Sequence, residues 1–469
     1  MCLLFLYQIF VSIKLMEINW KTFFTGKRIT QIGLGLLGRG VGDAEFLAEM
    51  GAELTVTDLK TAEQLKPSVE RLAKYKNIKF VLGEHRLEDF SAKGGQAKPD
   101  FILKGAGVPI DSPYIAEARR NNIPIEMGAS LFVKLAPKNV KIIGVTGTRG
   151  KTTTTMLIYE ILKKSFGENK VFLGGNIKDT ATLPLLKEVK DGDYVVMELD
   201  SWQLQGFGES KISPNVSVFT TFYPDHLNYY GGSMEKYFAD KANIFKYQKE
   251  KDVLIVGEQI TSLNLEIPNR AGVAMTNIVP ADWKIKIPGE HNLQNIACAI
   301  LATRALKVPE EIIREAVENF GGVPGRLEFI REINGVKIYN DTTSTTPEAT
   351  VAGLRALGSR RKNIVLMMGG DDKNLDMSGL IAEIPKYCRA VVMFKERGTD
   401  RIKNEVLSFK KKGLEVYEEE GLEATVKRAL SVAQNGDFLL YSPAFSSFGK
   451  YFKNEYERGE QFVELVKRL

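Results

Sequence analysis

The sequence predicts an α/β protein of three parts, each built from parallel strands with covering helices. Three observations support this prediction. A strand, a glycine-rich turn and a helix follow one another near the amino terminus, and the same order returns mid-chain with a lysine and a threonine after the glycines. The last third repeats apolar strands that end in polar loops. The length of 469 residues agrees, since domains average roughly 150 residues.

Composition and charge exclude several classes of protein. Hydrophobic residues make up 44% and charged residues 26% of the chain, which argues against a disordered tail or a small disulfide scaffold. The net charge of +6 is spread without a long run of one sign, so it does not indicate a nucleic-acid partner. Cys2, Cys298 and Cys388 share no metal-type spacing, which argues against a zinc site and a disulfide framework and indicates a reducing compartment.

Residues 1–15, MCLLFLYQIFVSIKL, are predicted to lie outside the fold. The apolar stretch from Leu3 to Ile13 is too short to span a bilayer, which needs about 20 residues. It also lacks a basic leader and a small-residue cleavage site. We favour an upstream start codon, with Met16 opening the first domain, over a membrane tether. We therefore expect no stable membrane insertion.

The first part, predicted as a domain over residues 16–138, opens with a glycine turn. Gly33, Gly35 and Gly38 form G-x-G-x-x-G after an apolar strand, and Asp58 ends the next strand. Such glycines let the backbone approach a phosphate at a helix N-terminus. An acid about 20 residues further on is placed to meet a sugar or base hydroxyl. The turn predicts a nucleotide site, although the same pattern also serves only to pack a helix on a strand.

The second part, predicted as a domain over residues 139–321, opens with a P-loop. Its segment KIIGVTGTRGKTTTT carries, in order, Gly144, Gly147, Gly150, Lys151 and Thr152. The common pattern G-x-x-x-x-G-K-[ST] does not fit, because its first position is Val145; the glycines fall as G-x-x-G-x-x-G-K-T-T. Backbone N–H groups of such a loop wrap phosphates, Lys151 supplies charge to the β and γ oxygens, and the Thr152 hydroxyl can ligate magnesium.

Other polar residues of the second part follow its predicted strands. Glu198 ends a buried strand where a second magnesium ligand belongs, although a strand-end acid more often faces solvent. Asp225 and His226 follow the next strand at the edge where ligands of open α/β sheets collect, and Lys241 lies on the helix after it. Asn292 begins a further helix, where an amide binds a nucleotide or caps the helix. The chain has only three histidines, His85, His226 and His291.

The third part, predicted as a domain over residues 322–469, repeats the αβ order. It opens with GVPGRLEFI, which carries Arg326, and its first predicted strand ends at Asp341. The segment NIVLMMGGDDKNLD brings Lys373, and DFLLYSP leads into the loop AFSSFGKYFKNEYERG and a terminal helix. Hydroxyls and a lysine at one sheet edge suit a small anionic substrate. Loops that only form turns are the alternative.

Taken together, the three parts resemble the Mur ligases, which are ATP-dependent amide-forming enzymes of peptidoglycan precursor synthesis. The resemblance begins at Arg28 and rests on GVTGTRGKTTTT, MELDSWQL, DHLNYYGGSMEKYFADKANIF, GEHNLQN, GVPGRLE, NDTTSTTPEA, MMGGDDK and LLYSPAFSSFGKYFKNEYERG. It implies a Rossmann-like first domain, a central P-loop ATPase domain and a Rossmann-like last domain. The first glycine turn, E-L-x-S-x-Q-L and S-P-A-x-x-S before K-N-x-x-x-R-G are similar to the member that adds D-glutamate.

The resemblance implies an activity and a set of site residues. The chain would add D-glutamate to UDP-N-acetylmuramoyl-L-alanine through an acyl phosphate, as a cytoplasmic monomer that uses ATP and two Mg²⁺ ions. The catalytic residues would be Lys151, Glu198, His226 and Lys241, with Lys241 carbamylated. ATP would contact Gly147, Thr148, Arg149, Gly150, Lys151, Thr152, Thr153, Asn292, Arg326 and Asp341. The metal ligands would be Thr152, Glu198 and His226. The UDP part would contact Gly33, Gly35 and Asp58, and the amino acid Thr345, Lys373, Ser447 and Phe448.

Some departures from the family pattern leave alternatives open. Thr343 stands where the family's D-S-K-A-T-N segment has a lysine, and the loop between Ser447 and Lys453 is one residue longer than usual. A relative that adds L-glutamate or another amino acid is therefore the first alternative. An NAD-dependent oxidoreductase would leave the P-loop without a role. A non-catalytic ATP-binding switch protein would not need Lys241 or the loop around Lys373.

Overall fold

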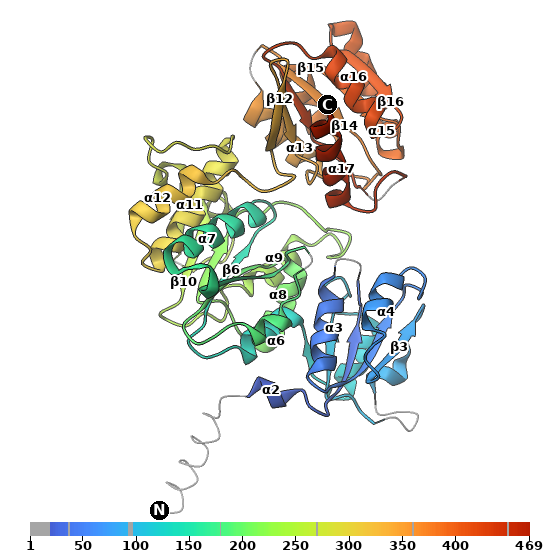
Figure 1. Ribbon diagram of the computed structural model, residues 1–469, viewed down its shortest axis with the longest axis vertical. Helices are drawn as coiled ribbons and strands as arrows, with labels where there is room; N and C mark the ends of the chain where they lie inside the picture. The colour runs from blue at the N-terminus through green and yellow to red at the C-terminus, as the bar shows by residue number, and fades with distance from the viewer. Residues whose placement is uncertain are drawn as a thin grey trace, which may run out of the picture. The chain divides into compact units, whose positions relative to one another are not determined.

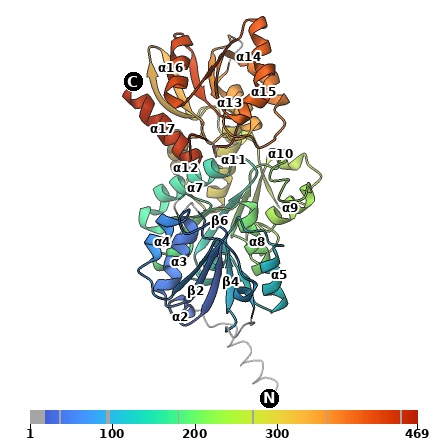
Figure 2. The same cartoon turned by 90° about the vertical axis from the view of Figure 1, so that its right-hand side faces the viewer.

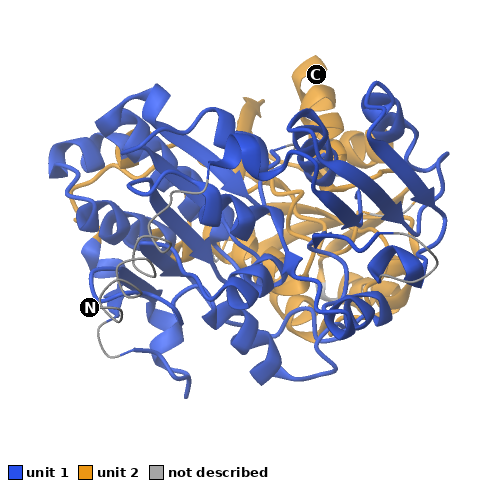
Figure 3. Ribbon diagram, turned by 90° about the horizontal axis from the view of Figure 1, so that it is seen from below, with its two compact units in different colours: residues 1–278, 294–316 blue, residues 279–293, 317–469 orange. Residues whose placement is uncertain are grey.

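The computed structural model describes residues 19–35, 38–91, 97–178, 180–268, 271–358, 361–447 and 450–469. They form two compact units (Figure 3). Unit 1 comprises residues up to 278 together with 294–316, and unit 2 comprises residues 279–293 and 317–469. None of the described helices is both long and apolar enough to cross a membrane.

The first sheet of unit 1 has five parallel strands in the order β3-β2-β1-β4-β5. It belongs to the blue part of the chain in Figures 1 and 2. Its strands are β1 (Arg28–Ile32), β2 (Glu53–Asp58), β3 (Ile78–Leu82), β4 (Phe101–Lys104) and β5 (Ile125–Glu126). The helices of this part are α2 (Trp20–Phe23), α3 (Arg39–Glu49), α4 (Lys66–Leu72), η1 (Leu87–Phe90), α5 (Pro113–Arg120) and α6 (Gly128–Leu135). The strand order reverses between β1 and β4, and in open α/β sheets ligands bind at such a point.

Both faces of this sheet are covered, as a parallel sheet requires. Ile32 and Ile102 pack with Ile115 of α5 in one apolar cluster. Ile29 and Leu103, whose side chains point the opposite way, belong to a second cluster. The strand predicted before the first glycine turn and the strand predicted to end at Asp58 are confirmed as β1 and β2.

The second sheet of unit 1 has six parallel strands in the order β11-β10-β9-β6-β8-β7. Its strands are β6 (Lys141–Thr146), β7 (Val171–Gly175), β8 (Tyr194–Glu198), β9 (Val216–Phe219), β10 (Val253–Gly257) and β11 (Gly272–Ala274). The helices after β6 are α7 (Lys151–Phe166), η2 (Glu168–Lys170), η3 (Leu183–Lys187), α8 (Ser201–Ser210), α9 (Met234–Ala242), α10 (Glu258–Thr261), η4 (Thr276–Ile278), α11 (Glu290–Ala305) and α12 (Glu310–Asn319). Because β6 lies between β8 and β9, the loop after β6 opens at the centre of the sheet.

The two sheets of unit 1 share an apolar core. Phe46 of α3, Phe132 of α6, Leu186 of η3 and Phe207 of α8 belong to one buried cluster. Burying a side chain of this size contributes roughly 1.5–3 kcal/mol, so the layers are held firmly together. Side chains of both layers can therefore line one pocket.

The sheet of unit 2 has six strands in the order β12-β13-β17-β14-β15-β16, and the edge strand β12 is antiparallel. Its strands are β12 (Glu328–Ile333), β13 (Val336–Asn340), β14 (Ile364–Met368), β15 (Cys388–Phe394), β16 (Glu415–Glu419) and β17 (Phe438–Tyr441). The helices are α13 (Pro347–Leu357), α14 (Ser378–Tyr387), α15 (Arg397–Ser408), η5 (Phe409–Lys412), α16 (Leu422–Val432) and α17 (Glu455–Arg468). The three sheets lie within the three predicted residue ranges, whose boundaries stay predictions.

Candidate functional site

The loop between β6 and α7 is a tight phosphate-type loop. Gly147 and Gly150 have φ angles of 148° and 86°, which favour glycine. A side chain at Gly147 would run into the Thr220 hydroxyl, and one at Gly150 into the Asn295 amide oxygen. The Thr148 N–H donates to the Thr221 carbonyl at 2.7 Å. The loop is therefore fixed by its neighbours before any ligand arrives.

Cationic side chains gather at this loop. Lys151 Nζ donates to the carbonyls of Gly147 at 3.0 Å and Thr148 at 3.2 Å. Lys241 Nζ donates to the same Gly147 carbonyl at 2.9 Å. Arg149 pairs with Asp225 at 3.0 Å. Since several cations stand around one short loop, the site favours a highly charged anion.

Lys241 is the most buried of these cations, with a relative exposure of 1%. Burial lowers the pKa of its amine well below the ordinary lysine value, and the nearby Lys151 charge lowers it further. The amine lies 4.9 Å from the Tyr237 ring centroid and 3.4 Å from the Thr146 hydroxyl. No carboxylate of the described residues forms an ion pair with it. Burial and the neighbouring Lys151 charge therefore both favour the uncharged form of the Lys241 amine.

Glu198 ends β8 beside the first turn of α7. Its carboxylate accepts the Thr152 hydroxyl at 2.6 Å and the Asn176 amide at 3.0 Å. It is 3% exposed, and no lysine or arginine among the described residues pairs with it. The chain turns at once into α8, where Asp200 and Gln203 form a capping box that fixes this corner. A buried carboxylate next to a threonine hydroxyl is the donor set that magnesium prefers.

His226 lies in the long loop between β9 and α9, with a positive φ of 53°. Its ring packs 4.7 Å from the Trp202 ring centroid, and its Nε2 lies 3.8 Å from an Asp225 oxygen. Desolvation lowers the pKa of His226 and so favours the neutral ring, which is the form that ligates a metal. Within the described residues, no three His, Cys, Asp or Glu side chains form a metal cluster by themselves. A metal here would need hydroxyl and phosphate oxygens as well.

The remaining predicted nucleotide residues are spread over both units. Thr153 is buried in the first turn of α7. In unit 2, the Asn292 amide donates to the Pro288 carbonyl at 2.7 Å. Asp341 is fully enclosed and accepts from Leu327 N, Ser344 Oγ and Ser442 Oγ. Burial raises the pKa of Asp341 to about 6, and the Arg326 charge acts in the opposite direction.

The residues predicted to bind an amino acid lie at the carboxyl edge of the sheet in unit 2. Lys373 Nζ donates to the Thr345 hydroxyl at 3.0 Å, so these two are brought together. The Ser447 hydroxyl lies 3.5 Å from a Glu455 oxygen. Phe448 lies outside the described residues. Thr343, which stands at the family's lysine position, donates its hydroxyl to the Gly325 carbonyl at 2.8 Å.

Sequence reasoning missed the buried arginine that holds this edge. Arg458 is 1% exposed and donates to the carbonyls of Thr342 at 2.7 Å and Ser446 at 3.4 Å. It therefore ties together the two loops that carry Thr345 and Ser447. The motif K-N-x-x-x-R-G contained this residue, but only the fold reveals what its guanidinium contacts.

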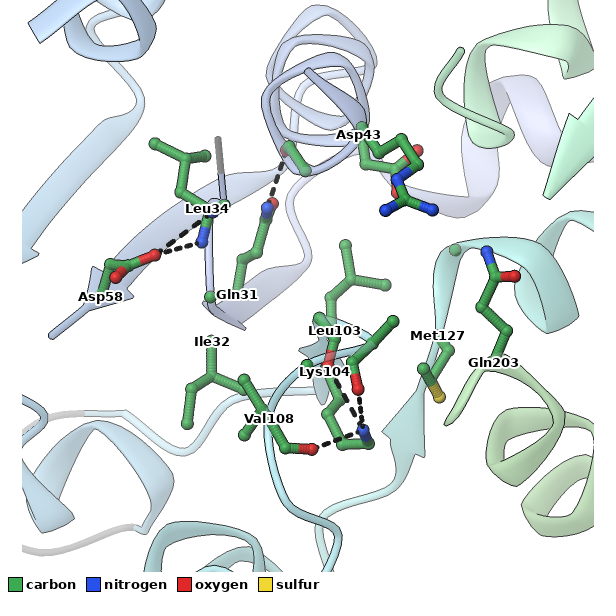
Figure 4. Close-up of a pocket in the computed structure, with 18 of the residues that line it drawn as sticks. Gln31, Ile32, Leu34, Asp43, Asp58, Leu103, Lys104, Val108, Met127 and Gln203 are labelled. Carbon is green, nitrogen blue, oxygen red and sulfur yellow. Dashed lines mark hydrogen bonds between the residues drawn. The ribbon is translucent and has the colours of Figure 1, made fainter. Parts of the chain in front are cut away.

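A cavity of about 560 Å³ opens at the carboxyl edge of the first sheet. Gly33, Gly35 and Asp58 line it together with the loop after β4. Figure 4 shows Asp58 joined to the first glycine turn, and Lys104 to the loop that ends at Val108. Gln203 of α8 also lines the cavity, so residues from the parts of unit 1 built on its first and its second sheet both contribute.

Asp58 is engaged with the backbone. One oxygen accepts the N–H groups of Leu34 at 2.8 Å and Gly35 at 3.2 Å, and the other accepts the Lys60 N–H at 2.9 Å. The spacing of Asp58 from the glycines predicted a ligand contact. The observed partners of its carboxylate are backbone N–H groups, two in the turn and one at Lys60.

Lys104 is a second group that the sequence did not single out. It is 2% exposed, and its Nζ donates to the carbonyls of Gly105, Ala106 and Val108 at 3.2, 3.5 and 2.7 Å. Burial lowers the pKa of Lys104 to about 8. It holds the loop that forms one wall of the cavity.

Comparison with known proteins places these features in a family. The Mur ligase middle domain matches residues 145–271, and the domain described as "Mur ligase, glutamate ligase domain" matches residues 325–445. A protein of Roseiflexus sp. (strain RS-1) named UDP-N-acetylmuramoylalanine--D-glutamate ligase is 35% identical over 94% of this chain and 98% of its own length. Proteins of the same name from Clostridium kluyveri and Borreliella afzelii are 34% and 32% identical, over 96% and 93% of this chain and 98% and 97% of their own.

Solved structures show a similar fold. The UDP-N-acetylmuramate-alanine ligase of Thermotoga maritima aligns with a TM-score of 0.58 at 21% identity, covering 94% of this chain and 99% of the other. The MurF ligase of the same organism, solved in complex with ADP, aligns with a TM-score of 0.56 at 18% identity, covering 95% and 96%.

Proposed function

The chain belongs to the Mur ligase family, and we propose that it adds D-glutamate to UDP-N-acetylmuramoyl-L-alanine with the consumption of ATP. Its relatives of nearly equal length carry the name of this activity. The observation that carries the proposal is the P-loop, where the amines of Lys151 and Lys241 meet at the Gly147 carbonyl beside the Thr152–Glu198 pair. We place the reaction in the cytoplasmic stage of peptidoglycan precursor synthesis and expect a monomer.

The first chemical step is the formation of an acyl phosphate. A carboxylate oxygen of the substrate forms a bond to the γ-phosphorus of ATP while the bond from that phosphorus to the ADP oxygen breaks. Both reactants are anions, so Lys151 and Arg149 have to offset the charge that gathers as they meet. Catalysis in this step is mostly positioning and electrostatic stabilisation.

The second step forms the amide. The deprotonated amine of glutamate attacks the acyl carbon and gives a tetrahedral intermediate. The carbon–oxygen bond to phosphate then breaks, and the nitrogen loses its extra proton. We propose Thr345, Lys373, Ser447 and Phe448 for the glutamate carboxylates. Because Thr343 replaces a lysine of the family pattern, a ligase for L-glutamate or another amino acid remains the alternative.

The residues beside the P-loop fit magnesium. Glu198 is buried without a cationic partner among the described residues, and its oxygen already meets the Thr152 hydroxyl at 2.6 Å. We propose that Thr152, Glu198 and the neutral His226 ring hold the metal. When bound, magnesium would neutralise phosphate oxygens during transfer.

Lys241 fits a further role in the same site. An uncharged amine adds to carbon dioxide to give a carbamate and a proton, and burial favours the uncharged form of Lys241. We propose that the resulting carboxylate helps to hold a second magnesium ion.

We propose nucleotide contacts beyond the P-loop as well. Asn292, Arg326 and Asp341 are assigned to ATP by the family resemblance, and Gly33, Gly35 and Asp58 to the UDP part of the substrate. The cavity along the first glycine turn supports the assignment of Gly33, Gly35 and Asp58 to UDP, since it has room for a nucleoside diphosphate.

The test is phosphate release from ATP in the presence of UDP-N-acetylmuramoyl-L-alanine. D-glutamate, L-glutamate and no amino acid are compared, and the product is weighed by mass spectrometry. We expect release with D-glutamate and a product heavier by one glutamyl residue. Phosphate release with L-glutamate but not with D-glutamate would show that the chain is a ligase for L-glutamate. The absence of phosphate release with both amino acids would refute the proposal.

A further inference from the structure

His85 occupies a part of the cavity that the reaction steps above do not use. It follows β3 and lines the cavity together with Asp58, Leu59 and Tyr114. Its ring meets the Tyr114 ring edge to face, with centroids 4.9 Å apart. Its Nδ1 lies 2.8 Å from the Thr57 hydroxyl of β2. The imidazole is therefore held from two sides.

The hydrogen bonds of Thr57 favour one tautomer of the His85 ring. A threonine hydroxyl has one proton to donate, and that of Thr57 goes to the Glu84 carbonyl at 3.0 Å. The tautomer with the hydrogen on Nδ1 satisfies both contacts of this hydroxyl, and it leaves Nε2 with a lone pair. Desolvation lowers the pKa of His85, which favours the neutral ring, while the Asp58 charge acts weakly the other way.

The Nε2 edge points away from β2, because the Nδ1 edge faces it. Within the described part of the chain, no group donates a hydrogen bond to Nε2, and this atom is not among the buried unsatisfied ones. It is therefore an acceptor available to a ligand in the cavity.

The position of His85 indicates which part of a nucleotide it would meet. In open α/β sheets the phosphates lie at the first glycine turn, and the nucleoside extends towards the end of the next strand, here β2. Asp58 at that end is engaged with three backbone N–H groups. His85 Nε2 is a polar atom there with no hydrogen-bond partner among the described residues, and Leu59, whose side chain is 65% exposed, also lines this part of the cavity.

We propose that His85 determines base specificity by accepting a hydrogen bond from the N3–H of uracil. The inference rests on the proposed function, which supplies a uridine nucleotide as substrate. Uracil carries a hydrogen on N3, whereas N3 of cytosine is an acceptor that would set a lone pair against the Nε2 lone pair. Leu59 offers an apolar surface to the base, and the Thr57 hydroxyl orients the imidazole through Nδ1.

The experiment is calorimetric titration of the full chain with UDP and with CDP. We expect the wild-type protein to bind UDP at least about tenfold more tightly than CDP, as the loss of a buried hydrogen bond implies. His85→Leu should bind both equally and weakly. Tyr114→Leu, the matched control, removes the ring contact but keeps the acceptor, so it should retain the preference for UDP.

A second readout separates binding from folding and from catalysis. In His85→Leu the KM for the uridine substrate should rise about tenfold, while kcat and the KM for ATP stay within about twofold. Equal binding of UDP and CDP by the wild type, or failure of UDP to bind, would overturn the inference even if ligation occurs. His85-dependent UDP binding without ligation would instead contradict the proposed function.

Discussion

Unit 1 contains two glycine turns built on the same plan, and they collect opposite charges. After β1, the N–H groups of Leu34 and Gly35 point at the carboxylate of Asp58. After β6, the carbonyls of the turn face lysine amines, with Lys151 and Lys241 sharing the Gly147 carbonyl. The backbone pattern is a strand, glycines with positive φ and a helix in both cases.

The difference suggests that surrounding charge, more than the glycine pattern, decides what a turn does. A diphosphate that is only held needs a shaped cavity and a rigid turn, which Asp58 supplies. A phosphoryl group in transfer gathers negative charge, so its loop needs cations that are in place beforehand. We therefore expect changes of charge at the second turn to affect the rate of reaction, and changes at the first to affect binding.

The largest effect should come from Lys151→Ala. Removing this cation should lower phosphate release about a thousandfold, since it offsets the charge of the transferred group. UDP binding, measured by calorimetry, should not change. The matched control is Lys60→Ala at the first turn, where the half-exposed amine lies 3.9 Å from Asp58. Lys60→Ala should alter the KM for the uridine substrate more than kcat. If it lowers the rate as much as Lys151→Ala does, the two turns do not differ in their need for a cation.

Lys241→Ala should have the second largest effect. It should lower the rate of phosphate release about a hundredfold if the lysine acts as a carbamate that binds metal. Short carboxylates such as formate should restore part of the rate, because they can occupy the vacated space. The wild-type enzyme should lose activity when carbon dioxide is removed and regain it with bicarbonate. No rescue in the variant, together with indifference of the wild type to bicarbonate, would refute carbamylation.

Lys104, which holds the wall of the cavity beside the first turn, offers a test through pH. Its pKa is about 8 in the folded chain against 10.5 for an ordinary lysine. Between these values the unfolded chain binds the proton and the folded chain does not, so the free energy of unfolding should rise with pH. The rise should reach at most about 3 kcal/mol by pH 10.5. Urea denaturation of wild type and Lys104→Met at pH 7.5 and 10.5 measures it, and identical pH slopes would contradict the assignment.

The sequence predicted the architecture because its signals are local. The apolar strand, the glycines and the helix of each turn are consecutive in the sequence, from Arg28 to Glu49 and from Lys141 to Phe166, and both turns form where predicted. The edge strand β12 was missed, since its exposed, alternating residues give no buried run. The spacing of Asp58 predicted an acid near the first turn but not that its oxygens meet the backbone.

The missed site residues depend on contacts between distant segments. His85 is tied to Thr57, 28 residues earlier, and Asn176 to Glu198, 22 residues later. Nothing in the neighbouring sequence marks either residue. Lys104 was overlooked because a lysine at a strand end normally faces solvent, and only its loop carbonyls explain its burial.

The smallest difference should appear between two glycine substitutions, one in each turn. Gly35 has a φ of 70° and open space where a side chain would go, so Gly35→Ala should cost only the conformational strain, about 1 kcal/mol. Gly150 has a φ of 86°, and a side chain there would strike the Asn295 amide of α11. Gly150→Ala should therefore lower the free energy of unfolding by about 1 to 2 kcal/mol more.

Thermal and urea unfolding of the two variants measure this contrast directly. The double variant Gly150→Ala with Asn295→Ala gives the control, because it removes the obstructing amide and should return the cost to that of Gly35→Ala. If the single variants lose equal stability, Asn295 moves aside freely. The close fit of the second turn would then come from strand β9 and Thr220 alone, and α11 would have no part in shaping the phosphate loop.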